Sequence, residues 1–113
     1  MAKGYHLQLA NLTDEQIEKV LESLPIRTQS SRIFKYLSKH SKVKTGRLCA
    51  NTATVNLSHA TQRELNPRIK KFGLVVACER PEVPYKNKFG DNTQEYDWSL
   101  YHLEDEWVKI YPN

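Results

Sequence analysis

The stretch TATVNLSHATQREL, residues 52–65, decides how this chain is expected to fold. Asn56 is one of the few residues that tolerate the left-handed backbone of a tight turn, and Ser58 is a strong N-cap for the helix that follows. A short helix, a sharp turn and a second, capped helix are the parts of a helix-turn-helix. The stretch therefore predicts this motif, with its second helix over residues 58–66.

The apolar pattern continues beyond this stretch at helical spacing, through Leu65, Ile69 and Phe72. Gly73 stands where a helix ends in a left-handed cap. Pro67 lacks a backbone donor, and its ring clashes with the preceding turn of a helix. It therefore predicts a kink, or a break in which Asn66 caps a new turn.

The residues before this stretch predict a strand and three helices. A short strand or arm is indicated by alternating apolar residues at Tyr5, Leu7 and Leu9. A capping box of Thr13 and Gln16 opens a helix over 14–24. Ser30 or Ser31 caps a second helix that ends near His40, and Thr45 caps a short third helix over 47–52.

The residues after Gly73 change to a strand pattern. Strands are predicted over 74–80 and 96–102, separated by a polar loop rich in proline, glycine and asparagine. They predict an antiparallel hairpin with a long loop, or wing, over 81–94, and loops of this length often carry function. The tail segment 107–111 is apolar enough to dock or to pair with a partner.

These elements together predict one α+β domain, a winged helix-turn-helix of three to four helices with a long β-hairpin wing and a short N-terminal strand. A chain of 113 residues has the length of one domain. Its expected parts are an N-terminal strand or arm (1–11), a helical part with the helix-turn-helix (12–73), the hairpin (74–103) and a tail (104–113).

Positive charge is concentrated in the middle of the chain. Residues 27–71 hold eleven basic side chains against Glu64 alone, although the whole chain has a net charge of only +4. Such a density of one sign attracts polyanions, whereas a merely solvated helix surface mixes both signs. Nucleic acid is favoured over anionic lipid, because no basic stretch carries the broad apolar face of an interfacial helix.

Several classes of protein are disfavoured by the sequence. No apolar run approaches the roughly 20 residues that span a bilayer. The first residues do not open a signal peptide, so we expect a cytoplasmic protein without membrane contact. Cys49 and Cys78 have apolar neighbours, which indicates buried thiols, and their spacing is not that of a zinc site.

Enzyme chemistry is also not indicated. The four histidines fall in separate predicted elements, without a paired carboxylate or a nucleophile motif; they are His6, His40, His59 and His102. We therefore expect no catalytic activity, cofactor, metal ion or small-molecule ligand.

The segment 57–65, followed by Phe72-Gly73-Leu74-Val75-Val76, resembles the recognition helix and first wing strand of winged helix-turn-helix regulators, in particular GntR-type DNA-binding domains. The resemblance covers about 20 residues as a motif and residues 28–103 as an architecture. Two residues depart from it: Gln62 stands where such families bury an aliphatic side chain, and Pro67 interrupts a helix that they keep whole. The resemblance implies binding of duplex DNA through the helix over 58–66.

Candidate contacts follow from that placement. Side chains expected to reach base edges in the major groove are Ser58, His59, Thr61, Gln62 and Arg63. Asn66 lies on the same predicted side. Contacts to phosphates, or from the wing, are expected from Lys42, Lys44, Arg47, Arg68, Lys70, Lys71, Tyr85, Lys86, Asn87 and Lys88.

The sequence therefore predicts a sequence-specific binder of double-stranded DNA, a small transcriptional regulator. Self-association through the N-terminal strand or the tail stays open. Two alternatives also stay open: a winged-helix module that docks an acidic protein, such as a mobile-element product binding a host partner, or RNA binding. RNA is less favoured, because the aromatic residues do not form the stacking motif of RNA-recognition sheets.

Overall fold

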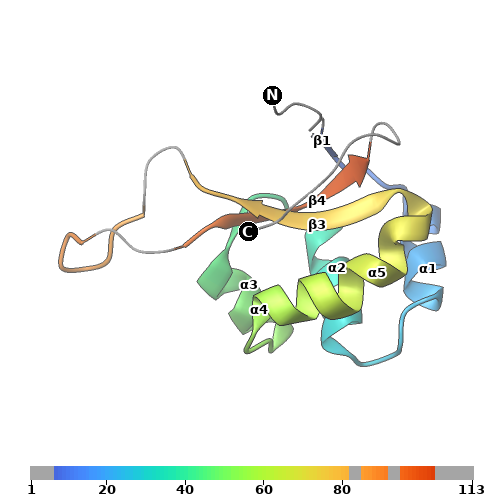
Figure 1. Cartoon of the computed structure of the whole chain (residues 1–113), viewed down its shortest axis with the longest axis horizontal. Coiled ribbons are helices and arrows are strands. Elements are labelled where there is room, and N and C mark those ends of the chain that lie inside the picture. The colour runs from blue at the N-terminus through green and yellow to red at the C-terminus, as the bar shows by residue number, and fades with distance from the viewer. Residues whose placement is uncertain (1–6, 82–84, 92–94, 104–113) are drawn as a thin grey trace.

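Helices form one layer and an antiparallel sheet forms the other in the computed structural model, which describes residues 7–81, 85–91 and 95–103 (Figure 1). In chain order the elements are β1 (Leu7–Leu9), α1 (Asp14–Glu22), α2 (Gln29–Leu37), β2 (Val43–Lys44), α3 (Thr45–Thr52), α4 (Leu57–His59), η1 (Ala60–Leu65), α5 (Asn66–Ile69), η2 (Lys70–Phe72), β3 (Leu74–Glu79) and β4 (Asp97–Leu103). The predicted α+β class is confirmed, and the arrangement is compatible with a winged helix.

Strand β4 is the centre of the sheet. It pairs antiparallel with β3 on one side, where Val76 lies opposite Leu100, and with β1 and β2 on the other. The hairpin and, from Leu7 onward, the short N-terminal strand are therefore confirmed, with hairpin strand ends that differ from the prediction by at most one residue. Tyr5 lies outside the described residues. The tail 104–113, including the predicted apolar segment, lies outside the described residues.

The first two helices begin at hydroxyl caps. Thr13 and Gln16 form the predicted capping box at α1. At α2 the prediction of Ser30 or Ser31 as the cap was wrong: Thr28 caps the helix by accepting a hydrogen bond from the Ser31 backbone nitrogen. Ser30 is instead buried within the first turn, so its side chain contributes to packing.

The main core lies between the helices and the inner face of the sheet. Apolar side chains at 0% exposure come from α2, α3, residues 57–72 and β3; they include Ile33, Phe34, Leu48, Leu65, Ile69 and Val76. Val75, Ala77 and Tyr101 alternate with these and form a smaller cluster on the other sheet face. This period of two is what a strand between two faces requires.

Residues 57–72 form one continuous helical run, which we call the 57–72 helix. It passes from α4 through the π-helical turn η1 into α5 and η2, and it ends at Gly73, whose φ of 75° provides the predicted left-handed cap. The prediction at Pro67 was a kink or a break, and the break was wrong. In the π turn the Asn66 nitrogen donates to the Thr61 carbonyl, so Pro67 falls in the first turn of α5, where a missing donor costs little.

Asn66 joins the 57–72 helix to the sheet. Its Nδ2 donates to the Val76 carbonyl at 3.0 Å, and its Oδ1 accepts from the Val76 nitrogen at 2.8 Å. Strand β3 pairs only with β4 among the described strands, so these two backbone groups lie on its open edge. The predictions of Asn66 as a cap and as a residue of the reading surface are therefore wrong; its amide substitutes for a neighbouring strand.

Replacing Asn66 with Ala should lower the free energy of unfolding by about 1–3 kcal/mol, because it leaves both Val76 backbone groups without a partner. Urea unfolding followed by tryptophan fluorescence measures the change. Asn51→Ala is the matched control: Asn51 is exposed, its amide bonds only within α3, and its loss should cost less than about 0.5 kcal/mol. Equal losses in the two variants would contradict the structural role given to Asn66.

Candidate nucleic-acid interface

The turn between α3 and the 57–72 helix bends at a different residue than predicted. Ala53 has left-handed backbone angles, φ 52° and ψ 45°, whereas Asn56 is extended at φ −116°. Asn56 instead caps α4, with its Oδ1 accepting from the His59 nitrogen at 3.1 Å. The predictions of Asn56 as the left-handed residue and of Ser58 as the cap were therefore wrong, and Ser58 is exposed within the first turn.

The end of α3 explains why the bend falls at Ala53. The Ala53 and Thr54 nitrogens both donate to the Cys49 carbonyl, which closes the helix. The buried hydroxyls of Thr52 and Thr54 lie 2.8 Å apart, on either side of Ala53. Arg32 holds the same end from α2, because its Nε donates to the Thr52 carbonyl at 2.7 Å.

Ala53→Gly should raise the free energy of unfolding by about 0.5–1 kcal/mol, because glycine adopts left-handed angles without the cost that a Cβ imposes. Asn56→Gly should lower it by a few tenths of a kcal/mol, because the cap is lost at an extended residue. Chemical denaturation of the two variants side by side checks the signs. The opposite pair of signs would put the left-handed residue back at Asn56.

One side of the 57–72 helix faces solvent and the other packs on the core. Ala60, Thr61 and Leu65 are at 0% exposure, so the prediction that Thr61 reads bases was wrong. The Thr61 hydroxyl donates to the Leu57 carbonyl at 2.9 Å, within its own helix. The exposed side chains in the first half of the helix are Ser58, His59, Gln62 and Arg63.

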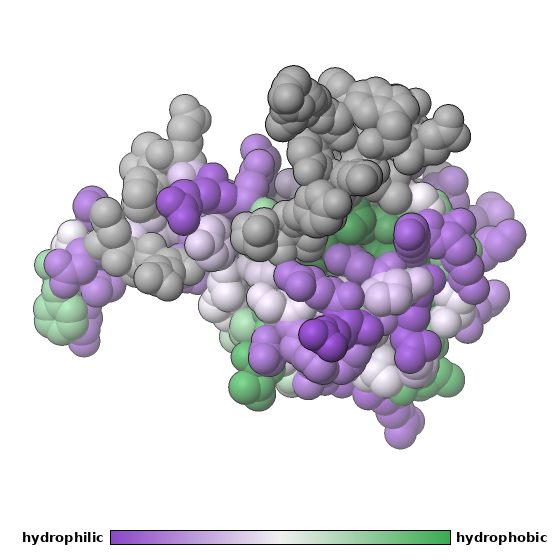
Figure 2. Space-filling model, in the orientation of Figure 1, coloured by the Kyte–Doolittle hydropathy of each residue, from purple (hydrophilic) through white to green (hydrophobic). Residues whose placement is uncertain are grey.

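These four residues recur at spacings of three and four, so they share one side of the helix. His59 Nε2 lies 3.4 Å from Glu64 Oε2, a contact between residues five apart that the π turn brings together. Arg63 is exposed and makes no hydrogen bond or ion pair with any residue that the structure describes. Its guanidinium is therefore available to a ligand. In Figure 2, hydrophilic side chains cover the front face where Figure 1 shows this helix.

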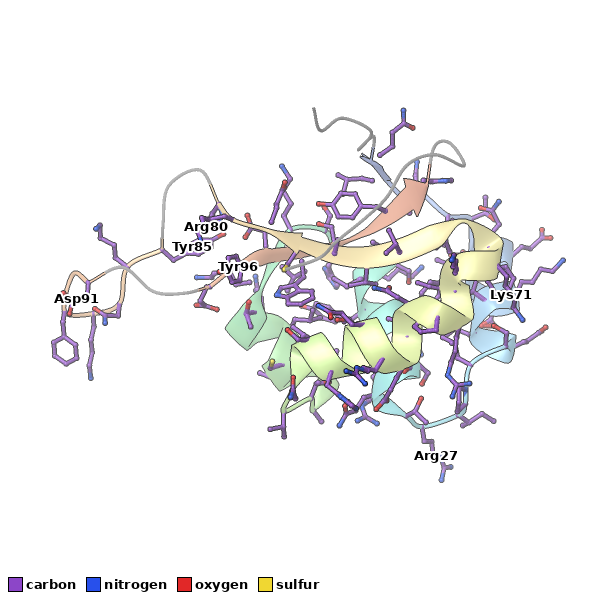
Figure 3. The ribbon with its side chains drawn as sticks, viewed as in Figure 1. Arg27, Lys71, Arg80, Tyr85, Asp91 and Tyr96 are labelled. Carbon is purple, nitrogen blue, oxygen red and sulfur yellow. The ribbon has the colours of Figure 1, made fainter. Side chains whose placement is uncertain are left out.

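The predicted phosphate contacts are exposed but do not form one patch. Lys42, Lys44 and Arg47 lie at β2 and the start of α3, and Arg68 lies on α5. Lys70 and Lys71 lie at the C-terminal end of the 57–72 helix. Figure 3 shows Lys71 at the end of the molecule opposite Asp91 in the hairpin loop, and Arg27 below the helices. Among the described lysines and arginines of the 27–71 stretch, Lys39 alone forms an ion pair, with Asp14 at 3.1 Å.

The start of α3 is tied to the base of the hairpin. The prediction of Thr45 as a cap was wrong, since α3 begins at Thr45 itself. Its hydroxyl accepts a hydrogen bond from Trp98 Nε1 at 2.8 Å, and the Gly46 nitrogen donates to Glu95 Oε1 at 2.8 Å. A Cβ at Gly46 would lie 3.2 Å from that oxygen, so glycine permits the close approach. The carboxylate thus occupies the helix N-terminus.

The hairpin is also held at its neck, which Figure 3 marks with Arg80, Tyr85 and Tyr96. The Tyr85 hydroxyl donates to Asp97 Oδ1 at 2.7 Å, and this bond raises the pKa of Tyr85. Lys44 Nζ lies 4.5 Å from the centre of the Tyr85 ring, and the Arg80 guanidinium lies 5.9 Å from that of Tyr96. Tyr85 therefore stabilises the base of the hairpin. Tyr85 was predicted to contact DNA, but its hydroxyl instead donates to Asp97.

The described end of the hairpin, residues 85–91, is a closed turn. Asn87 Oδ1 accepts from the nitrogens of Phe89 at 2.8 Å and Asp91 at 3.1 Å, so Asn87 shapes the loop and its carbonyl oxygen is not spare for DNA. The Asn87 nitrogen donates to the Asp91 carbonyl, and Gly90 adopts φ 86°. Lys86 and Lys88 are exposed, as is Phe89 at 76%.

The two cysteines lack the lowered pKa that a reactive thiol requires. Burial raises the pKa of Cys49, with a smaller contribution from Glu95, and burial also raises the pKa of Cys78. Both thiols therefore stay protonated at neutral pH. They are half-buried, not fully buried as predicted. Within the described ranges no three His, Cys, Asp or Glu side chains converge to hold a metal ion.

Comparison of the chain with protein-family models, with curated proteins and with solved structures found no significant match. In the described part of the chain, no helix is both long and apolar enough to cross a membrane.

Proposed function

We propose that this protein binds double-stranded DNA in a sequence-dependent way and acts as a small transcriptional regulator. The observation that carries the proposal is the exposed side of the 57–72 helix: Ser58, His59, Gln62 and Arg63 project from one side of a helix whose other side is fully buried. An α-helix fits the major groove, and a helix after a tight turn presents its first residues to base edges.

The chemistry of these side chains suits that task. The Arg63 guanidinium can pair with O6 and N7 of guanine, and the Gln62 amide can pair with N6 and N7 of adenine. Ser58 lies beside the N-terminus of the helix, where it would approach a phosphate. Glu64 is the one acidic residue between 27 and 71, and its carboxylate lies 3.4 Å from His59 Nε2.

The remaining basic residues supply affinity. Lys44 and Arg47 lie at β2 and the start of α3, and Arg68 and Lys70 lie in the second half of the 57–72 helix. Contacts from such residues to phosphates release counterions and give binding a steep dependence on salt, with little preference for sequence. In this proposal the hairpin end lies over the backbone or the minor groove, and the protein acts in the cytoplasm. Self-association through β1 or residues 104–113 stays a prediction.

Arg63→Ala should reduce the preference for a selected duplex over a scrambled one by about 1–3 kcal/mol, because one base-edge pair is lost. The duplex is first enriched from a randomised pool with the intact chain. Binding is then measured by band shift at two salt concentrations. Lys70→Ala is the matched control: it should weaken both duplexes equally and lower the salt slope by about one.

The outcomes separate the alternatives. An unchanged preference in Arg63→Ala would show that Arg63 does not read bases. Weak, sequence-blind retention of every duplex by the intact chain would favour a module that docks an acidic protein. Tighter binding to RNA of the same sequence would favour an RNA ligand. Circular dichroism confirms that both variants, changed at exposed residues, are folded.

A further inference from the structure

We propose that Phe89 is a wedge that inserts between base pairs, so that the hairpin kinks the DNA that the 57–72 helix reads. The inference rests on the proposed function and adds to it a deformation of the ligand. Phe89 is 76% exposed, and its turn stands away from the body of the protein (Figure 1). Figure 2 shows a hydrophobic group at this far end, set among hydrophilic side chains.

The size of the Phe89 side chain and its polar surroundings favour a step between two base pairs as its binding site, rather than the surface of a protein. Phe89 is the one large exposed hydrophobic among residues 85–91. A single ring is too small to form the apolar centre of a stable protein interface, which takes several side chains on each partner. It matches the apolar wedges, Phe among them, that architectural proteins insert between neighbouring base pairs from the minor groove.

The charge beside the ring favours a nucleic acid in particular. Lys88 Nζ lies 5.2 Å from the centre of the Phe89 ring, so a cation accompanies the ring wherever it inserts. In a minor groove the ring would meet the stacked bases while the ammonium group met the phosphates at the groove edge.

The backbone of the turn is organised before binding. Asn87 closes the turn through its side-chain oxygen, and Gly90 supplies the one left-handed residue among 85–91. The neck is braced separately by Tyr85 on Asp97. An inserted ring must displace stacked base pairs without being displaced itself. Because both the turn and the neck are held by hydrogen bonds, the loop loses little conformational entropy on insertion. Ile26 and Val55 are more exposed, at 84% and 94%, but they lie in the turns that join α1 to α2 and α3 to α4.

The test measures bending and base unstacking on the duplex enriched with the intact chain. Dyes at the two ends report the bend by energy transfer, and 2-aminopurine at pyrimidine–purine steps flanking the selected site reports unstacking. The intact chain should bend the duplex by about 20–90°, with a rise in 2-aminopurine fluorescence. Phe89→Ser should abolish both signals, whereas Phe89→Leu should keep them, because leucine also serves as a wedge.

Matched controls isolate the ring. Ile26→Ser removes a more exposed apolar side chain, from the turn between α1 and α2, and should leave the bend unchanged. Lys88→Ala should weaken binding of all duplexes while the bound duplex stays bent. The preference for the selected over the scrambled duplex should survive Phe89→Ser, because that preference is assigned to Arg63.

Each failure has its own signature. Selective binding without any bend, or an undiminished bend in Phe89→Ser, would overturn the wedge and leave the proposed function intact. Bending without sequence preference would overturn the proposed regulator and leave the wedge intact. Failure of the intact chain to bind any duplex would overturn both.

Discussion

The amide of Asn66 is the contact on which the arrangement of this protein depends. It satisfies both Val76 backbone groups on the open edge of β3, and it does so from the middle of the 57–72 helix. A helix packed only through apolar side chains can slide or rotate by small amounts at little cost. Two directional hydrogen bonds to one strand residue fix its rotation, and so decide which side chains face solvent.

The π turn in the 57–72 helix allows the helix to continue through Pro67. An uninterrupted α-helix through Pro67 would direct its ring against the Arg63 carbonyl. The wider turn at 60–65 moves the proline to the start of a new α-helical turn without ending the run. It also places Glu64 against His59. The exposed face of the helix is therefore set by a backbone irregularity and by Asn66 together.

How much of this the sequence could predict depends on how local each interaction is. The capping box at Thr13, the cap at Gly73 and the strand that follows it are encoded within a few residues, and these predictions are confirmed. The partner of Asn66 lies ten residues away, and Glu95 reaches α3 across 49 residues. No spacing rule signals either contact, because each depends on where the sheet edge or the hairpin base lies.

The turn of the helix-turn-helix shows a second reason why a sequence-based prediction can be wrong. Asn and Gly are the residues that a left-handed position normally favours, so the pattern indicated Asn56. The structure places Ala53 there, because hydrogen bonds at the end of α3 and the buried threonine pair on either side fix the bend. Thr61 is a different case: it lies four residues from both Leu57 and Leu65, so regular helical spacing already places it on the buried side, and its assignment to the reading surface overlooked this.

The two elements proposed to touch DNA are attached to one pair of strands. The 57–72 helix is bonded to the edge of β3, and the base of the hairpin is bonded through Trp98 of β4 to Thr45 at the start of α3. Several of these contacts must break together before the helix and the hairpin base can move relative to each other. Smooth bending of a 20–30 bp site costs about 1–6 kcal/mol, less where pyrimidine–purine steps kink easily. When the spacing of the helix and the hairpin does not match a straight duplex, the duplex is therefore the softer partner, and it is the one expected to deform.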